Sequence, residues 1–208
     1  MRICAIITEI HSKQKRAGVL MPQGKKSSIE EVCVKENRIF DGKILSVRCD
    51  EVLTPSGHHA SREVVEHKPA VGMIAFTDRK TVLLVRQYRY AVHEETLEIC
   101  AGLIEPGENP AQAAEREMQE ELNVKASELH RIGEFYASPG FCTEIFTLYL
   151  AEGLERSSLP QDEDENVSVC EVKLSDVPKM IREGKIRDSK TFAALSWLMA
   201  KEGIAPEG

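Results

Sequence analysis

The sequence contains no long apolar run. No segment of the 208-residue chain approaches the roughly 18 consecutive apolar residues of a membrane-spanning helix, so we expect no membrane span. The first ten residues are too short, and with Arg2 and Glu9 too polar, for a convincing secretory signal. These absences predict a soluble, cytoplasmic protein that does not contact a membrane.

Cysteine pairs at metal-binding spacing are also absent. The cysteines form no CxxC pair and follow no regular spacing; they are Cys4, Cys33, Cys49, Cys100, Cys142 and Cys170. This pattern argues against a zinc site and does not suggest a disulfide framework. We expect reduced thiols, most of them buried as small hydrophobic side chains.

The chain also lacks an internal repeat and a long structureless stretch that would separate domains. With 42% hydrophobic residues it can bury one good core, so a single main fold is the default expectation.

Charge is unevenly distributed along the chain. Residues 1–28 carry six Lys or Arg against one Glu, about +5, which leaves about −12 on the remainder because the total is −7. The acidic remainder argues against nucleic-acid binding by the folded domain. We interpret residues 1–28 as a poorly ordered basic extension, with contacts to nucleic acid or an anionic surface as the alternative.

Short apolar runs separated by turn residues predict a small antiparallel sheet in residues 29–69. An alternating segment from Glu31 to Lys35 precedes apolar runs at 39–47 and 52–53 and a strand from Ser61 to His67. Further strands are expected at 70–76, 81–90, 96–101, 128–136, 144–150 and 167–174, and helices at 175–183 and 190–201. Residues 86–90 combine cations with aromatic rings, which suits phosphate pairing and ring stacking but equally an exposed strand end.

A carboxylate-rich segment, residues 102–124, is the most informative part of the sequence. Its apolar residues recur at spacings of three and four, which predicts a helix from Pro110 to Leu122. Asn109 suits the N-cap, Pro110 suits the first helical position, and Asn123 suits the left-handed conformation that ends a helix.

On that helix Glu117, Glu120 and Glu121 project to one side, because they are related by three and four residues. A solvated acidic face is one interpretation. Like charges at this spacing destabilise a helix unless a cation lies among them, and Mg²⁺ prefers oxygen ligands from a few carboxylates. A magnesium site is therefore the alternative.

The complete spacing favours the metal site. Gly102, Glu108, Arg116-Glu117 and Glu120-Glu121, followed by Val124, resemble the Nudix box of the Nudix hydrolases, with Asn123 where the family usually has Gly. The resemblance implies an α/β (α+β) Nudix fold with a mixed β-sheet sandwiched between helices. It implies a Nudix hydrolase domain over residues 70–208 and an N-terminal β-sheet subdomain over 29–69 that is used for dimerisation.

Features outside the box are similar to the ADP-ribose pyrophosphatase branch of that family. They are Arg62-Glu63 within residues 61–67, the segments 85–90, 97–104 and 138–144, and the acidic loop at 159–166. Pro139 is at the position of a family marker for ADP-ribose substrates. The resemblance implies Mg²⁺-dependent hydrolysis of ADP-ribose to AMP and ribose 5-phosphate, with Mn²⁺ as a substitute ion, in a homodimer with composite sites.

The same resemblance assigns roles to individual residues. It places metal on the carbonyl of Ala101 and on Glu117 and Glu121, with Glu120 and Glu165 as further candidates, and it makes Glu163 the base that deprotonates water. Arg116 braces the carboxylates. The residues expected to contact substrate are Arg62 and Glu63 (adenosine), Arg89 (phosphates), and Ser138, Gly140 and Glu144 (terminal ribose).

Three other functions stay open at this point. Related branches act on GDP-mannose or UDP-glucose and share parts of this residue set. An ADP-ribose-binding regulatory module without turnover is a different class, which the intact Glu117, Glu120 and Glu121 oppose. A nucleoside triphosphate pyrophosphatase is opposed by Arg62 and Pro139.

Overall fold

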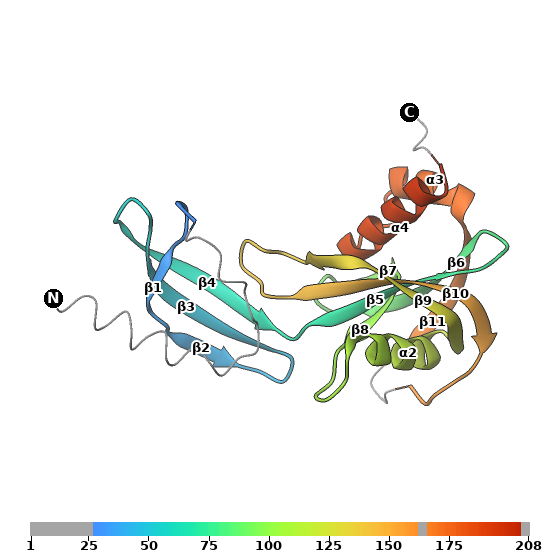
Figure 1. Cartoon of the computed structure of the whole chain (residues 1–208), viewed down its shortest axis with the longest axis horizontal. Coiled ribbons are helices and arrows are strands. Elements are labelled where there is room, and N and C mark those ends of the chain that lie inside the picture. Colours follow the sequence, from blue (N-terminus) through green and yellow to red (C-terminus); the bar gives the residue numbers. More distant parts are fainter. Residues whose placement is uncertain (1–26, 162–165, 205–208) are drawn as a thin grey trace.

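The computed structural model describes residues 27–161 and 166–204, which form a small N-terminal sheet joined to a larger mixed sheet flanked by helices (Figure 1). The small sheet is antiparallel and contains β1 (Val32–Lys35), β2 (Arg38–Asp41), β3 (Leu45–Leu53) and β4 (His59–His67). β3 is its centre, since it pairs with β4 along its whole length and with both β1 and β2. The expected antiparallel sheet is therefore present.

The two sheets are connected directly. Only Lys68 and Pro69 separate β4 from β5, and the chain runs almost straight from one sheet into the other in Figure 1. A second link comes from the turn after β9, because Val65 of β4 donates to the Phe141 carbonyl at 2.7 Å and accepts from Thr143 N–H at 2.9 Å. This turn holds the end of the small sheet against the main domain.

The main sheet has seven strands in the order β11-β6-β5-β10-β9, with β7 paired to β6 and β8 to β5. Its strands are β5 (Ala70–Phe76), β6 (Thr81–Arg89), β7 (Glu94–Glu98), β8 (Cys100–Leu103), β9 (Val124–Tyr136), β10 (Ile145–Arg156) and β11 (Val167–Lys173). β5 and β10 are parallel and the other pairs are antiparallel. The sheet is therefore mixed, as expected.

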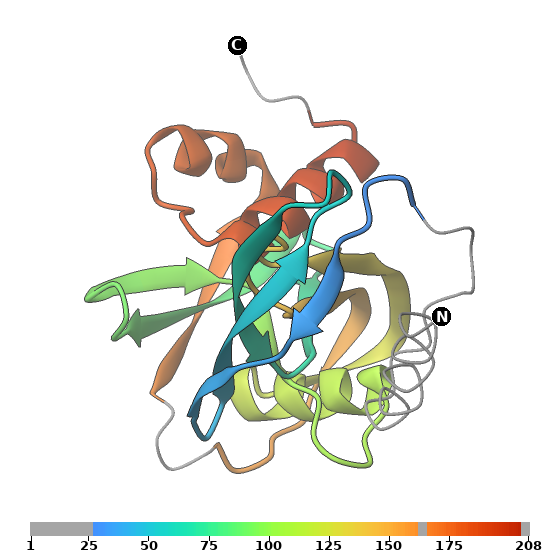
Figure 2. The same cartoon turned by 90° about the vertical axis from the view of Figure 1, so that its left-hand side faces the viewer.

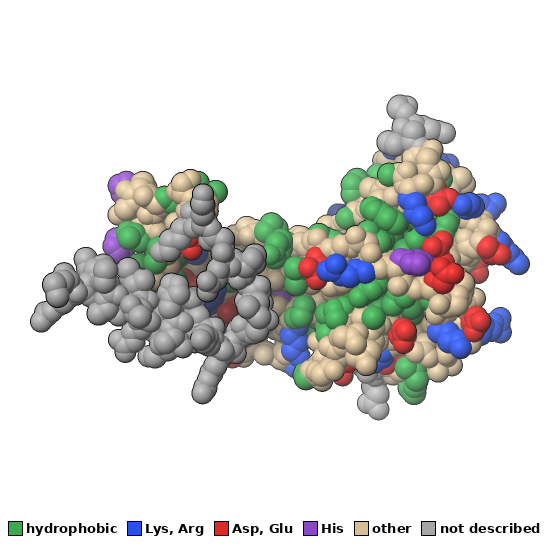
Figure 3. Space-filling view, in the orientation of Figure 1, with side chains coloured by type: hydrophobic (Ala, Val, Ile, Leu, Met, Phe, Trp, Pro, Cys, Tyr) green, Lys and Arg blue, Asp and Glu red, His purple; other side chains and the backbone are tan. Residues whose placement is uncertain are grey.

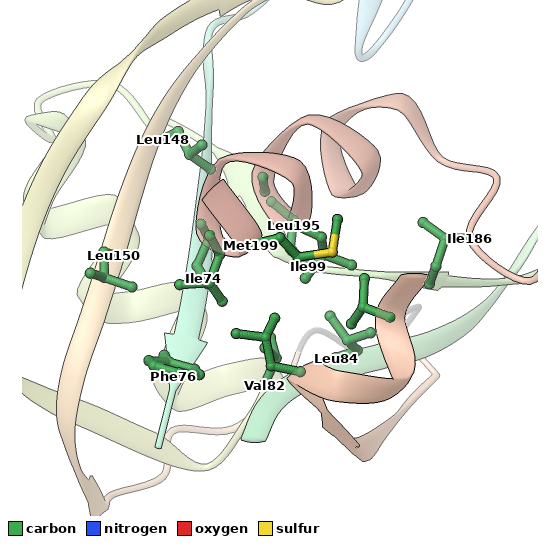
Figure 4. Close-up of a cluster of buried hydrophobic side chains, with 14 residues drawn as sticks. Ile74, Phe76, Val82, Leu84, Ile99, Leu148, Leu150, Ile186, Leu195 and Met199 are labelled. Atoms are coloured by element: carbon green, nitrogen blue, oxygen red, sulfur yellow. The ribbon is translucent and has the colours of Figure 1, made fainter. Parts of the chain in front are cut away.

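Helices cover both faces of this sheet. The helix α2 (Pro110–Glu121) lies on one face, while the 3-10 turn η2 (Leu174–Asp176), α3 (Val177–Arg182) and α4 (Ser189–Lys201) lie on the other (Figures 1 and 2). Successive side chains of a strand point to opposite faces, so β5 serves two cores. Ile74 and Phe76 pack in the core beneath α4 (Figure 4), and Val71 and Met73 pack in the core beneath α2.

The ends of α2 follow the expected pattern. The Asn109 side chain accepts hydrogen bonds from Ala111 N–H at 3.0 Å and Gln112 N–H at 3.1 Å, and Gln112 Oε1 accepts from Asn109 N–H at 2.9 Å. Asn123 has φ of 56°, the left-handed conformation predicted for it. The helix ends one residue earlier than predicted, with Leu122 as the C-cap.

Some predicted elements differ from the structure. The single strand expected at 96–101 is two strands that break at Ile99, whose N–H donates to Thr191 Oγ1 of α4 at 2.8 Å. β9 and β10 extend beyond their predicted limits because their polar ends still pair with each other, from Val124 opposite Arg156 onwards. The helix predicted at 175–183 is the turn η2 followed by α3.

Among the described cysteines, Cys100 is buried, and Cys33, Cys49, Cys142 and Cys170 are half-buried free thiols. None of the described helices is long and apolar enough to cross a membrane. Acidic and basic side chains are interspersed over the main domain on the face shown in Figure 3. Of the basic extension, only residues 27 and 28 are among the described residues.

Candidate active site

The carboxylate helix α2 lies against β8 in very close contact. A Cβ atom added to Gly102 would lie 1.9 Å from the Cδ of Glu117, so only glycine leaves room for that carboxylate. Ala101, the preceding residue, donates its N–H to the Glu121 carboxylate at 3.2 Å. Glu117 and Glu121 are 6% and 3% exposed, so both acids of this pair are buried where the strand meets the helix.

Arg116 connects three carboxylates of the motif. Its guanidinium binds Glu108 through Nε at 2.8 Å, and Nη1 lies 2.7 Å from Glu117 and 2.8 Å from Glu120. Nη2 donates to the Leu103 carbonyl at 3.0 Å. The hydrogen bonds with the three carboxylates, first that with Glu108, raise the pKa of Arg116. The structure therefore places one cation among three acids, which is the arrangement that a bracing role requires.

The charge of this cluster suits a divalent cation. Glu108, Glu117, Glu120 and Glu121 carry four negative charges against one positive charge on Arg116, a net charge of −3 when all are ionised. The donors are all oxygen atoms, which Mg²⁺ prefers over softer ligands.

The protein part of the metal site is incomplete in the described residues. Within 27–161 and 166–204, no three His, Cys, Asp or Glu side chains are already grouped as ligands. Glu165 and the expected base Glu163 lie outside the described residues. The fit to Mg²⁺ therefore rests on the buried carboxylates of Glu117 and Glu121, and Mg²⁺ normally keeps several non-protein ligands.

A cavity of about 640 Å³ opens beside this cluster. It is lined by residues from both sheets and from α4, among them His67, Arg89, Ala101, Gly102, Glu117, Glu144 and Lys190. Its volume falls in the range of small-molecule sites, roughly 300–1,000 Å³. The cavity thus brings the expected metal residues Ala101 and Glu117 together with the expected substrate residues Arg89 and Glu144.

Arg89 is held at this cavity by a buried carboxylate. Its Nε and Nη2 bind the two oxygens of Glu98 at 2.8 and 2.7 Å, and Glu98 is only 2% exposed. Lys190 of α4 also pairs with Glu98. Burial alone would raise the pKa of Glu98, but the hydrogen bonds from Arg89 and the charge of Lys190 outweigh it and lower the pKa to about 2. Glu98 is therefore ionised at neutral pH.

The sequence analysis did not identify Glu98, Lys190 or Asp188 as residues of this site. One signal was available, because Glu98 lies among apolar residues in the strand predicted at 96–101, and a carboxylate that such a strand buries needs a cationic partner. The sequence could not show which cation this was, since Lys190 lies 92 residues further along the chain.

Other expected substrate residues lie elsewhere in this chain. Arg62 is on β4, where it pairs with Glu31, and Glu63 lines a separate cavity of about 310 Å³. Ser138 and Gly140 lie in the turn that contacts β4, and the Ser138 carbonyl accepts from Cys142 N–H at 2.9 Å. None of these four is among the residues that line the larger cavity in the described part of the chain.

Comparison with known protein families identifies the family of this chain. Residues 66–195, more than half of the chain, match the model of the NUDIX domain. The chain belongs to the Nudix hydrolase family. The resemblance inferred from residues 102–124 is thus confirmed. Residues 31–65 match the model of the nucleoside diphosphate sugar hydrolase N-terminal domain, so the chain is a Nudix hydrolase of the nucleoside diphosphate sugar type.

Several curated proteins are similar over most of the chain. An ADP-ribose pyrophosphatase of Bacillus subtilis is 39% identical over 181 residues, covering 85% of this chain and 97% of the relative. A methanol dehydrogenase activator of Bacillus methanolicus is 37% identical over 84% of this chain and 96% of the relative. A GDP-mannose pyrophosphatase of Salmonella paratyphi B is 36% identical over 65% of this chain and 80% of the relative.

A solved structure shares the fold. The crystal structure of an ADP compounds hydrolase aligns with 87% of this Nudix chain and all of its own chain, with a TM-score of 0.77 and 20% identity. The expected Nudix fold, with its mixed sheet, helices and separate N-terminal sheet, is therefore present.

Gly102 provides a direct test of the contact between β8 and α2. Gly102→Ala should displace the Glu117 carboxylate, because the new Cβ would overlap it, and should weaken Mg²⁺ affinity by about tenfold to a hundredfold. The measurement is hydrolytic activity as a function of Mg²⁺ concentration. Gly133→Ala is the matched control, since a Cβ there meets nothing within 4 Å. Unchanged Mg²⁺ dependence in a folded Gly102→Ala variant would contradict the assignment of Glu117 as a metal ligand.

Proposed function

We propose that this Nudix hydrolase cleaves the pyrophosphate bond of ADP-ribose to give AMP and ribose 5-phosphate. The observation that supports it best is that one cavity is lined both by Glu117 of the acidic cluster and by the guanidinium-bearing Arg89. A pyrophosphate needs cations around its oxygens, and Arg presents a planar fork that matches phosphate geometry. The 39% identity to an ADP-ribose pyrophosphatase supports this substrate.

In this proposal, separate residues bind the metal ion, orient the carboxylates and act as the general base. Glu117, Glu121 and the Ala101 carbonyl would hold Mg²⁺, with Glu165 as a further ligand, and Glu120 would belong to the same carboxylate set. Bound Mg²⁺ would neutralise phosphate oxygens and make a coordinated water more acidic. Arg116 keeps the carboxylates oriented through its ion pairs with Glu117 and Glu120. Glu163 accepts the proton of the attacking water, which is general-base catalysis.

The substrate contacts divide between the two sheets. Arg89 binds the phosphates from the cavity wall. Glu144, immediately before β10, binds the terminal ribose, and its Oε1 lies 3.4 Å from His67 Nδ1. Ser138 and Gly140 are assigned to the same ribose from the neighbouring turn. Arg62 and Glu63 are assigned to the adenosine part of a substrate bound at the other subunit of a homodimer.

Two alternatives have specific support. The GDP-mannose pyrophosphatase relatives favour hydrolysis of another nucleoside diphosphate sugar. The second alternative is a regulatory role, which the relative named methanol dehydrogenase activator favours. An ADP-ribose-binding module without turnover would bind the nucleotide and release no AMP, so product analysis separates the two classes.

A substrate panel tests the proposal. With Mg²⁺ or Mn²⁺, the protein should convert ADP-ribose to AMP and ribose 5-phosphate faster than it cleaves GDP-mannose or UDP-glucose, as measured by chromatography of the products. EDTA should abolish turnover, because the acidic cluster needs a cation before an anionic substrate can approach. Turnover that resists EDTA would contradict the metal assignment. A clear preference for GDP-mannose would select the first alternative.

Glu121 and Glu163 should fail differently when each is changed to Gln. Glu121→Gln removes a metal-binding charge and should raise the Mg²⁺ concentration needed for activity. Glu163→Gln should lower kcat by about a hundredfold or more and leave KM and Mg²⁺ dependence nearly unchanged, because it affects the transition state alone. The measurement is full kinetics at several Mg²⁺ concentrations.

Glu165→Gln completes that comparison. If Glu163→Gln kept near-normal kcat while Glu165→Gln abolished it, the roles of base and ligand would be exchanged. The enzyme class would be unaffected by that result.

Dimerisation through the N-terminal sheet is the remaining part of the proposal. Ile39, Phe40 and Ile44 are exposed on or beside this sheet, with Phe40 at 55%. Phe40→Glu should therefore convert a dimer into a monomer in sedimentation experiments and reduce activity if the sites are composite. Val92→Glu is the matched control, since Val92 is 57% exposed and lies between β6 and β7. A fully active wild-type monomer at micromolar concentration would exclude composite sites.

A further inference from the structure

The first turn of α4 meets the cavity at a buried charged cluster. Glu98, at the end of β7, accepts hydrogen bonds from Arg89, from Thr96 Oγ1 at 2.6 Å and from Lys190 Nζ. Lys190 is 8% exposed and also lines the cavity, although the proposed function gives it no role. Two cations therefore share one buried carboxylate.

Lys190 is held in a defined position by the N-cap of its own helix. Asp188 accepts from Thr191 N–H at 2.9 Å and from Thr191 Oγ1 at 2.6 Å, and its second oxygen accepts from Lys190 Nζ at 2.9 Å. Thr191 Oγ1 in turn accepts from the Ile99 N–H at the break between β7 and β8. The helix start is thus attached to the strand segment that leads directly to Ala101 and Gly102.

Because Lys190 also pairs with Glu98, Arg89 is freer to bind an anion. Arg89 uses Nε and Nη2 on Glu98, while Nη1 makes no hydrogen bond with any described residue and the side chain is 44% exposed. A buried carboxylate whose only cation was Arg89 would hold that guanidinium tightly, because separating the pair would leave a buried charge uncompensated. With Lys190 present, Glu98 keeps a cationic partner when Arg89 turns toward an anion.

Lys190 also sets the charge beside the cavity. Glu98 and Asp188 contribute two negative charges and Arg89 and Lys190 two positive charges, so the group is neutral when all are ionised. Removing the Lys190 charge would leave this group at −1 next to the place where the pyrophosphate is expected. Both effects act in the same direction, against binding of an anionic substrate.

We infer that Lys190 is a positioning residue of the hydrolase site, which neutralises Glu98 so that the Arg89 guanidinium is available to the phosphates of the substrate. This inference rests on the proposed function, in which Arg89 binds the phosphates. It adds that α4, which lies well after the Nudix box in the sequence, affects how tightly Arg89 can bind the phosphates of the substrate.

The test compares three variants with the wild-type protein. Lys190→Met should raise KM for ADP-ribose about tenfold or more and change kcat much less, the pattern of lost substrate binding. Lys190→Arg keeps the charge and should restore most of the affinity. Lys190→Gln keeps a hydrogen-bond donor for Glu98 but not the charge, so it should resemble Lys190→Met even if the Met variant folds poorly.

Two further measurements separate positioning from general destabilisation. Lys201→Met, on the same helix but paired with Glu152 at 3.6 Å, is the matched control and should keep normal KM. In an Arg89→Met background, Lys190→Met should add little to KM, because it acts through Arg89. An additive effect in the double variant, or a fall in kcat with unchanged KM, would overturn the inference.

Failure of the proposed function would be distinguishable from failure of this inference. If the wild-type protein does not cleave ADP-ribose, the substrate assignment is wrong, and the same variants are compared on the nucleoside diphosphate sugar that it does cleave. If the wild type cleaves ADP-ribose and Lys190→Met has normal KM, the inference about Lys190 is wrong and the proposed function stands.

Discussion

The contact between Gly102 and Glu117 is the constraint on which the active site depends. A strand and a helix can approach this closely only where one residue has no side chain, and the space so created holds a carboxylate. Burying Glu117 and Glu121 together is unfavourable unless cations offset their charge. Arg116 supplies one cation within the protein, and the remaining charge makes the position suitable for Mg²⁺.

Two charged groups of different composition therefore lie on one cavity. The group on α2 is strongly acidic, with one arginine among four glutamates, while the group at the start of α4 balances two acids with two cations. The charges of Asp188 and Glu121 contribute, after the hydrogen bonds with Glu98, to the raised pKa of Arg89, so the two groups are close enough to interact. In the proposed function, a metal ion on the first group and the Arg89 guanidinium of the second would meet the two needs of pyrophosphate hydrolysis.

The break at Ile99 explains how a single strand region serves both groups. β7 ends with Glu98, which holds Arg89, and β8 begins with Cys100, beside Ala101 and Gly102. Because the Ile99 N–H is bound by Thr191 and not by a neighbouring strand, the chain can change direction between these two functions. The C-terminal helix thus binds, from the opposite face of the sheet, the strand break that immediately precedes Ala101 and Gly102.

The sequence by itself determined the local features of this protein. The spacing of residues 102–124 was sufficient for the helix α2, for its caps at Asn109 and Asn123, and for the family, because these depend on residues that are neighbours along the chain. Only the tertiary structure decided that Lys190 and Thr191 meet Glu98 and Ile99, 92 residues away. It also placed Arg62 and Glu63 away from the cavity of their own chain. Such contacts depend on how the helices pack on the sheet, and no periodicity in the sequence records which distant side chain will satisfy a buried charge or N–H group.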